Sequence, residues 1–247
     1  MRFSIFTFSL VLLILTQIST SSSHLAIDVE TGVVATGYND VRIPGDEGTF
    51  ISFKDDLSPD PAFFYRLRLD YRIGIGHNVS VLYAPLEINS NGSVDKDIVF
   101  EGKTFPANSD IEALYKFNSY RITYRYDFIK NPTVELGVGF TAKIRDAKIS
   151  LTSPEMDSEK TNVGFVPIVN FRLLWNFHEQ FGLLLYGDAL AAPQGRAEDV
   201  LLATTYKFSD NIMIRAGYRI LEGGADNDEV YNFALIHYAS AGVTYTF

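Results

Sequence analysis

The sequence predicts an all-β protein that forms a closed antiparallel transmembrane β-barrel of about ten strands after a cleaved signal peptide. Three observations predict this fold class. Long segments alternate apolar and polar residues, tight turns alternate with longer polar links, and the chain ends on an aromatic residue, Phe247. After the first residues no segment is apolar for the length of a spanning helix, so a membrane-embedded chain would have to cross as strands.

Residues 1–23 have the features of a secretory signal peptide, which leaves residues 24–247 as the barrel domain. Arg2 supplies a positive charge, the run Ile5–Ile18 is mostly apolar, and Ser19–Ser23 is small and polar, which suits cleavage. The apolar run is shorter than the roughly 20 residues that a spanning helix needs. An uncleaved membrane anchor is the alternative interpretation of the same segment.

The composition narrows the classes of function. The 247 residues include 14 Tyr and 19 Phe, which favour strands, and no Cys. The absence of Cys excludes disulfide frameworks, thiol catalysis and Cys-ligated metal sites. The formal net charge of -9 argues against a nucleic-acid partner, because phosphate binding requires a basic face.

Ten segments with a period of two are expected as strands. They span residues 26–38, 62–74, 78–88, 111–128, 134–149, 163–177, 181–192, 197–208, 212–222 and 234–247. The clearest is 163–177, where Phe165, Val169 and Phe171 share one face while Asn170 and Arg172 lie on the other. Pro85 and Pro167 fall inside two of these segments, so bulges or strand ends are expected there.

The links between these segments alternate in length. Those after the second, fourth, sixth and eighth segments are tight, whereas most of the others are long and polar, at about 39–61, 89–110, 150–162 and 223–233. The link at 193–196 is a short member of the long series. This alternation is typical of outer-membrane barrels, whose short turns are periplasmic and whose long loops are extracellular. An even number of strands then places both termini in the periplasm.

These features together resemble the small single-chain outer-membrane barrels of Gram-negative bacteria, a broad class that includes the OmpA type. The resemblance rests on residues 1–23, on the hairpin rhythm and on the ending 241–247. Val243, Tyr245 and Phe247 resemble the terminal signal read by the barrel-assembly machinery. The resemblance implies a monomer in contact with outer-membrane lipid, lipopolysaccharide and that machinery.

Closure of the barrel would turn most of the charged residues inward. The expected lumen charge network comprises Asp28, Glu30, Arg66, Arg68, Asp70, Arg72, Arg121, Arg125, Glu135, Lys143, Arg145, Arg172, Asp188, Lys207, Arg215 and Arg219. In a narrow barrel these groups should form a ladder of ion pairs that fills much of the lumen. The alternative is a narrow pore that favours anions. Alternation also places Asp199 inward, but Glu198 and Asp199 lie close to Arg196 at the short link, which favours a salt-bridged rim.

The links at 39–61 and 223–233 are acidic. Solvated loops kept soluble by their charge are one interpretation, and divalent cations that bridge them to lipopolysaccharide are another. Asp226, Asp228 and Glu229 are candidate ligands for Ca²⁺ or Mg²⁺, although only the first acids of a twelve-residue calcium loop are present. An ordinary acidic hairpin loop is the alternative there, and no other cofactor is expected.

The function class that fits best is a non-enzymatic barrel with a structural, adhesive or narrow-channel role. One alternative is an outer-membrane enzyme that acts on lipid or protein at the extracellular rim, and another is a soluble β-barrel that binds a small ligand. His237 with Asp226 or Asp228 resembles the carboxylate–His arrangement of the omptin proteases, which also have ten strands. A second Asp pair is missing and alternation turns His237 outward, so no catalytic residue is assigned.

Overall fold

A computed structural model of the chain describes residues 24–192 and 195–247. The expected signal peptide, residues 1–23, lies outside the described residues. Among the residues described, no helix is long and apolar enough to cross a membrane.

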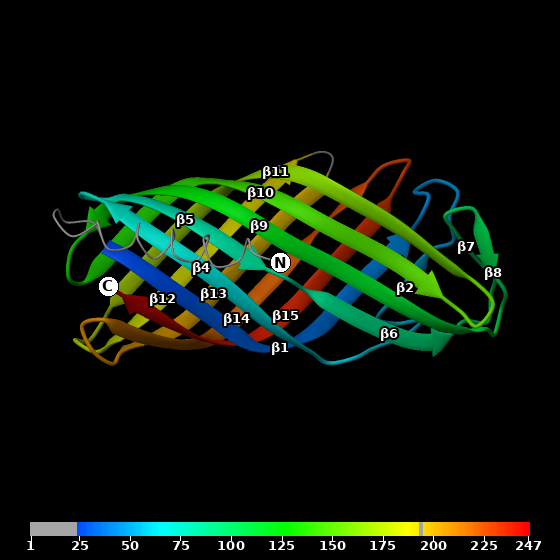
Figure 1. The fold of residues 1–247 in the computed structure, drawn as a ribbon, viewed down its shortest axis with the longest axis horizontal. Helices are drawn as coiled ribbons and strands as arrows, with labels where there is room; N and C mark the ends of the chain where they lie inside the picture. Colours follow the sequence, from blue (N-terminus) through cyan, green and yellow to red (C-terminus); the bar gives the residue numbers. More distant parts are fainter. Residues whose placement is uncertain (1–23, 193–194) are drawn as a thin grey trace, which may run out of the picture.

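Ten antiparallel strands close into a barrel within this part of the chain, as the alternating pattern predicts (Figure 1). In order around the wall they are β1 (His24–Arg42), β4 (Ala62–Ile73), β5 (His77–Ala84) continued by β6 (Glu87–Ser93), β9 (Asp110–Lys130), β10 (Val134–Thr152), β11 (Asp157–Asn176), β12 (Phe181–Ala192), β13 (Gly195–Lys207), β14 (Ile212–Asp226) and β15 (Tyr231–Thr246). Pairing of β1 with β15 closes the wall.

Four short strands belong to the longer links. β2 (Ile51–Ser52) pairs with β1, and β3 (Ser58–Pro59) pairs with β6. β7 (Ile98–Phe100) and β8 (Lys103–Phe105) form a separate hairpin.

Two of the expected long links are wrong, because the strands continue through them. β10 and β11 pair out to Thr152↔Asp157, where a loop over 150–162 was expected. β14 and β15 pair out to Asp226↔Tyr231, so the link at 223–233 shrinks to a tight turn. Ile149 at the expected strand end and Leu151 just beyond it are buried, and the apolar contacts they gain explain why pairing continues.

The two prolines affect the wall in different ways. β5 ends just before Pro85, and β6 then resumes the pairing with β9. Pro167 lies inside β11 and keeps its place opposite β10. On its other side, the pairing of β11 with β12 stops at Val169↔Ala189. Because proline has no N–H to donate, both positions lie where the ladder is interrupted on one side.

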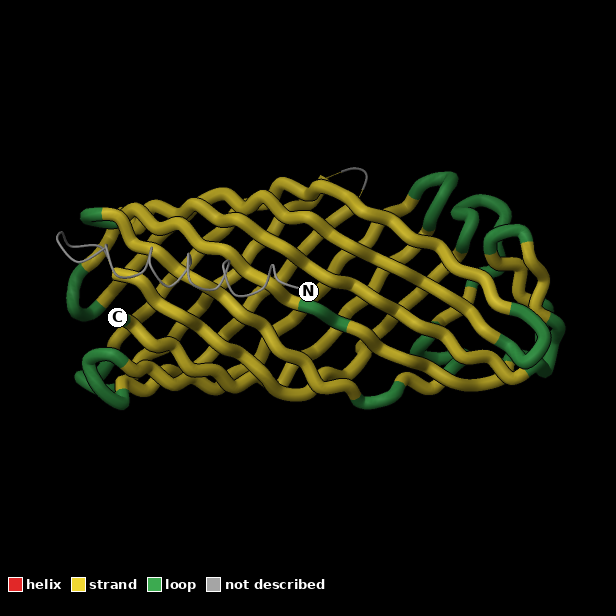
Figure 2. Tube along the Cα trace, viewed as in Figure 1, coloured by secondary structure: helices red, strands yellow, loops and turns green. Residues whose placement is uncertain are grey.

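The barrel has two unlike ends, shown in Figure 2. The turn end carries the tight links at 74–76, 131–133, 177–180 and 208–211, together with both ends of the described chain. There the Phe247 N–H donates to the Leu25 carbonyl at 2.9 Å. The loop end carries the links at 43–61 and 94–109 and the turns at 153–156 and 227–230.

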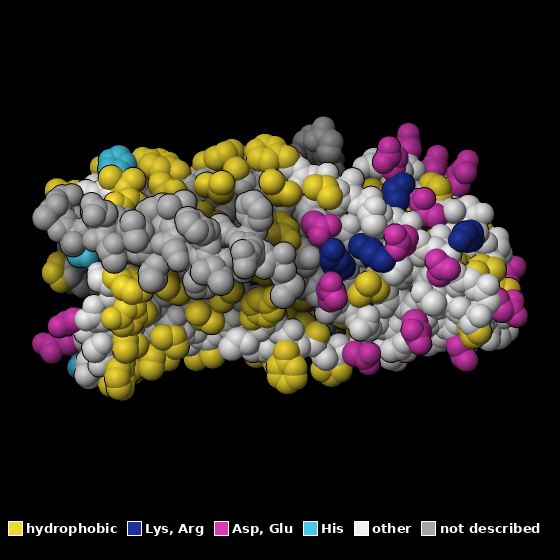
Figure 3. All heavy atoms as spheres, in the orientation of Figure 1, with side chains coloured by type: hydrophobic (Ala, Val, Ile, Leu, Met, Phe, Trp, Pro, Cys, Tyr) yellow, Lys and Arg dark blue, Asp and Glu magenta, His cyan; other side chains and the backbone are white. Residues whose placement is uncertain are grey.

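A belt of exposed apolar side chains surrounds the barrel on the side of the turn end (Figure 3). This apolar belt includes Ile27, Val29, Val33, Phe63, Tyr65, Leu67, Leu69, Val81, Tyr120, Ile122, Tyr124, Tyr126, Val138, Phe140, Ile144, Phe165, Val169, Trp175, Leu202, Tyr218, Val243 and Tyr245. A belt that runs around the whole wall far exceeds the apolar patches that soluble proteins expose. It is the surface that lipid would cover.

Candidate functional site

The middle of the barrel is crossed by a network of eight buried charges, here called the central network. Its acids and bases are equal in number, and they come from strands on all sides of the lumen. The acids are Asp28, Glu30, Asp188 and Asp199, and the bases are Arg66, Arg121, Arg215 and Arg219. No member of the network is more than 6% exposed. Burial on this scale is tolerated only when each charge is paired, and here each is.

Asp199 on β13 is the hub of the central network. Its carboxylate accepts from Arg66 Nη2 at 2.9 Å and from Arg121 Nη2 at 2.5 Å, and it also pairs with Arg219. Arg121 in turn reaches Asp188 on β12, with its Nη1 2.6 Å from Oδ2. Three guanidinium groups from β4, β9 and β14 thus meet on one carboxylate, which joins facing walls of the barrel.

A second branch of the network lies along the seam where β1 meets β15. Arg219 donates from Nε and Nη2 to the two carboxylate oxygens of Glu30, each at 2.8 Å. Arg215 bridges Glu30 and Asp28, with its Nη2 2.9 Å from Asp28 Oδ1. Thr244 on β15 donates its hydroxyl to Asp28 Oδ2 at 2.6 Å. The seam therefore gains side-chain bonds inside the lumen in addition to its backbone ladder.

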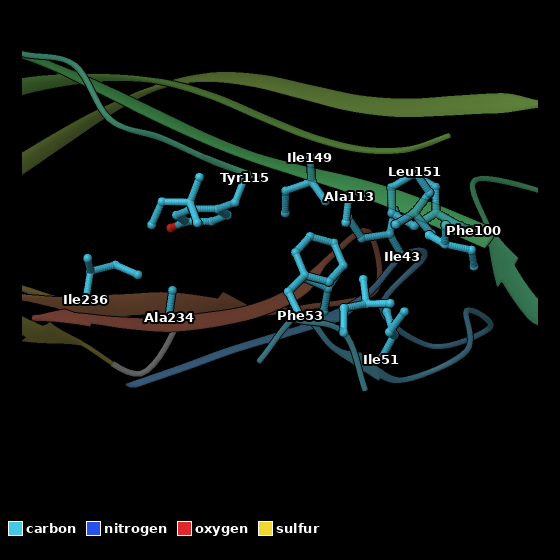
Figure 4. Packing of buried hydrophobic residues seen from close by; sticks show 14 of the residues in the cluster. Ile43, Ile51, Phe53, Phe100, Ala113, Tyr115, Ile149, Leu151, Ala234 and Ile236 are labelled. Carbon is cyan, nitrogen blue, oxygen red and sulfur yellow. The ribbon is translucent and has the colours of Figure 1, made fainter. Parts of the chain in front are cut away.

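Above the central network, toward the loop end, apolar side chains pack together inside the lumen (Figure 4). This apolar core combines residues of the links with inward residues of the strands: Ile43, Ile51, Phe53, Leu57, Ile98, Phe100, Phe105, Ile111, Ala113, Tyr115, Ile149, Leu151, Ala234, Ile236 and others. Phe53, Ile51 and Phe105 are completely buried.

Below the network, toward the turn end, the barrel holds a cavity of about 1250 Å³. Charged side chains on its wall include Arg68, Asp70, Arg72, Arg125, Glu135, Arg172 and Lys207, and the acids Glu179 and Asp210 also line it. Arg172 Nη1 lies 2.6 Å from Glu135 Oε2, and Arg125 Nε lies 2.7 Å from Asp127 Oδ1. Gly137 leaves room for Asp127, because a Cβ there would lie 2.1 Å from Asp127 Oδ1. This cavity is a basic vestibule that ends at the central network.

The sixteen residues of the expected charge network separate into three groups in the structure. Seven of them, together with Asp199, form the central network. Another group, Arg68, Asp70, Arg72, Arg125, Glu135, Arg172 and Lys207, lines the vestibule. Lys207 differs from the expectation, since it pairs with Asp210 of the adjacent turn at 2.7 Å and its side chain is 55% exposed. Lys143 and Arg145 lie on the loop-end side and make no ion pair with a described residue.

Asp199 is the residue that the sequence reasoning placed incorrectly. A rim salt bridge with Arg196 was expected, but Arg196 pairs with Glu222 at 2.7 Å. Asp199 lies three residues further along β13, on the opposite face of the strand, inside the lumen. The alternating pattern of β13 already indicated the inward position of Asp199. The expected rim salt bridge was wrong because it relied on the proximity of Asp199 to Arg196 in the sequence.

The candidate catalytic and metal residues do not assemble into a site. His237 faces outward, and its Nδ1 is hydrogen-bonded to the Tyr218 hydroxyl, which lies on the barrel surface. Within residues 24–192 and 195–247, no group of three or more His, Asp or Glu side chains is arranged to hold a metal ion. Asp226, Asp228 and Glu229 are exposed in the β14–β15 hairpin, and metal binding there stays a prediction.

The three residues of the expected insertion signal lie on the outer face of β15 and at its end. Val243, Tyr245 and Phe247 are 44%, 43% and 60% exposed. The rings of Tyr245 and Phe247 pack edge to face with centroids 4.9 Å apart. They are thus accessible at the turn end, on the strand that closes the barrel.

Comparison with known proteins shows which solved structures share this fold. No protein-family model matches the chain, and no curated protein matches it. Among solved structures, the outer membrane protease OmpT from Escherichia coli is similar with a TM-score of 0.54 at 10% identity, over 93% of this chain and 99% of that chain. The fold is that of an outer-membrane β-barrel.

Other outer-membrane barrels match less well. Ail, the attachment invasion locus protein of Yersinia pestis, covers 90% of this chain and 99% of its own at 13% identity and a TM-score of 0.42. Neisserial surface protein A covers 92% and 98% at 17% identity and a TM-score of 0.36. At these identities the likeness establishes the fold alone, so the role of this outer-membrane β-barrel has to be argued from its own residues.

Proposed function

We propose that this chain is an integral outer-membrane protein whose closed barrel has a structural or adhesive role at the cell surface. The observation that carries the proposal is the filling of the lumen at two successive levels. The central network has paired, buried charges at every position, and the apolar core packs directly beyond it. Conduction requires a continuous polar path in which an ion binds weakly enough to be released. Neither the fully paired central network nor the apolar core supplies such a path.

The proposed orientation places the turn end in the periplasm and the loop end outside the cell. Short periplasmic turns and longer extracellular connections are the usual arrangement of such barrels. His24 and Phe247 would then both lie on the periplasmic side. The apolar belt would be covered by membrane lipid, and the extensions of β9, β10 and β11 would project beyond the outer leaflet.

The loop end presents an acidic surface to its surroundings (Figure 3). The exposed acids on it include Asp46, Glu47, Asp55, Asp60, Asp95, Asp97, Asp110, Glu112, Glu155, Asp157, Asp226, Asp228 and Glu229. Divalent cations would bridge these carboxylates to the phosphates of neighbouring lipopolysaccharide. We further propose that the barrel-assembly machinery reads Val243, Tyr245 and Phe247, and that the inserted barrel is a monomer.

Extraction from cells, gel migration and solute permeability test this proposal. A membrane barrel should be extracted only with detergent, and it should migrate differently on a gel before and after boiling. Proteoliposomes that contain the protein should not swell in an isotonic solution of a small sugar, because the lumen is closed. Recovery in the soluble periplasmic fraction would refute the location, and rapid swelling would refute the closed lumen.

A further inference from the structure

A second cavity, of about 370 Å³, lies in the loop-end half of the barrel. Part of its wall is apolar and includes Phe117, Ile149 and Ile236, while Lys143 and Arg145 of β10 line another part. Its volume falls in the range of roughly 300–1,000 Å³ that is usual for small-molecule sites. Neither the closed lumen nor the acidic surface explains a cavity of this mixed chemistry.

The barrel wall is open beside this cavity. The pairing of β11 with β12 ends at Val169↔Ala189, but β11 continues toward the loop end as far as Asp157 and pairs there only with β10. β12 continues to Ala192 and pairs there only with β13. The two strands therefore separate above Val169, as the interruption at Pro167 favours, and leave a lateral gap among the described residues.

The lateral gap begins at the level of the apolar belt. Val163 and Phe165, on the outer face of the same part of β11, are 72% and 65% exposed. Val166 and Leu190, on the two edges of the gap, both line the cavity. In the proposed orientation, on which this inference rests, the cavity therefore communicates with the apolar part of the outer leaflet.

Two bases on the cavity wall, Lys143 and Arg145, form no ion pair with a described residue. Lys143 is 3% exposed, and its one described polar interaction is with the Phe117 ring, whose centroid lies 4.6 Å from Nζ. Arg145 donates to Asn162, and its buried Nε has no hydrogen-bond partner. The other bases on the cavity wall are all paired: Lys148 with Glu159, Lys160 with Glu101, and Arg196 with Glu222. A half-buried guanidinium whose buried Nε has no hydrogen-bond partner favours an anion.

We propose that this cavity binds a single-chain amphiphile with an anionic headgroup, of the long-chain carboxylate class, which enters from the outer leaflet through the lateral gap. The headgroup binds at Lys143 and Arg145. The alkyl chain passes Val166 and Leu190 and extends toward the membrane. The cavity volume favours one chain, since a lipid with several chains needs more room than about 370 Å³.

Photo-crosslinking of the barrel in phospholipid nanodiscs tests this site. The probe is dodecanoate that carries a diazirine on its chain, and mass spectrometry maps the adducts. We expect adducts on the inner face of 143–166 and at Leu190, which unlabelled dodecanoate removes and dodecanol does not. The double variant K143M/R145M, and separately L190W, should lower this labelling at least tenfold.

A matched control removes two positive charges outside the cavity. The variant K103M/K207M should label like the parent protein, and all variants should show the parent's gel shift on heating if they are folded. Labelling that is confined to the apolar belt, equal competition by dodecanol, or no loss in folded K143M/R145M would overturn the site. A protein that fails to enter nanodiscs at all would instead contradict the proposed membrane location.

Discussion

Arg219 and Asp199 form an ion pair at the centre of the barrel, with side chains that are 1% and 3% exposed. The same carboxylate also holds Arg66 and Arg121, which come from the other side of the lumen. Water is excluded from all four groups, so the pairing compensates for a desolvation cost that none of them could bear alone. This relationship should make Asp199 highly sensitive to substitution.

Replacement of Asp199 by Asn should destabilise the barrel strongly. Three buried arginines would lose their shared counterion, and the removal of one partner from a buried pair costs about 3–5 kcal/mol. Denaturant unfolding in detergent micelles, followed by tryptophan fluorescence and by the gel shift, would measure the change. Asp210→Asn is the control, because its pair with Lys207 is exposed in a turn and contributes little. Equal stability of the two variants would refute the central role of Asp199.

The apolar core should hold the links at the loop end in their folded conformation. Phe53 is completely buried among link and strand residues, and truncation of such a side chain to Ala costs about 3–5 kcal/mol. We expect Phe53→Ala to make the link at 43–61 sensitive to protease while the strands below the core remain folded. Phe50→Ala, at an exposed position of the same link, should leave it resistant. If both variants resist cleavage equally, the link does not depend on this core.

Single cysteines can report the orientation, because the natural chain has none. Asp46 and Asp228 lie exposed at the loop end, whereas Asn131 and Asp210 lie exposed in tight turns. In whole cells, a maleimide that does not cross the membrane should label cysteine at the first two positions and not at the last two. The opposite pattern would invert the proposed orientation. Labelling of all four after cell lysis confirms that each thiol is reactive.

Phe247 should matter for assembly more than for the stability of the finished barrel. Its ring is 60% exposed and packs edge to face on Tyr245, so Phe247→Ala removes little buried area. We expect the variant to fold normally from denaturant into detergent, but to reach the outer membrane in smaller amounts. Normal amounts in cells would show that the terminal ring is not part of the insertion signal. A defect in both assays would assign it a structural role.

The alternating pattern was sufficient to predict the barrel, the number of strands and the inward direction of most charges. A period of two encodes the face of each residue directly, and Thr244 beside Asp28 follows from counting along two strands. The pattern does not encode which inward charges meet across the lumen. Pairing across the lumen depends on strand stagger and barrel width, so the role of Asp199 as the hub could not be derived.

The apolar core was missed for a different reason. The link at 39–61 is conspicuous for its acids, most of which are exposed. They obscured the apolar residues among them, Ile43, Ile51, Phe53 and Leu57, which are buried. Several apolar residues within a long polar link indicate that the link folds into the loop end of the barrel. The lateral gap likewise depends on where pairing stops between two strands, and Pro167 is its only trace in the sequence.

Conductance in planar bilayers tests the closed lumen most directly. The purified, heat-modifiable protein would be added to a lipid bilayer under an applied voltage, with an open porin measured in parallel as a positive control. Because the central network and the apolar core both block the path, we predict no discrete conductance steps from this protein. Regular steps of uniform size from the folded parent protein would contradict the closed barrel.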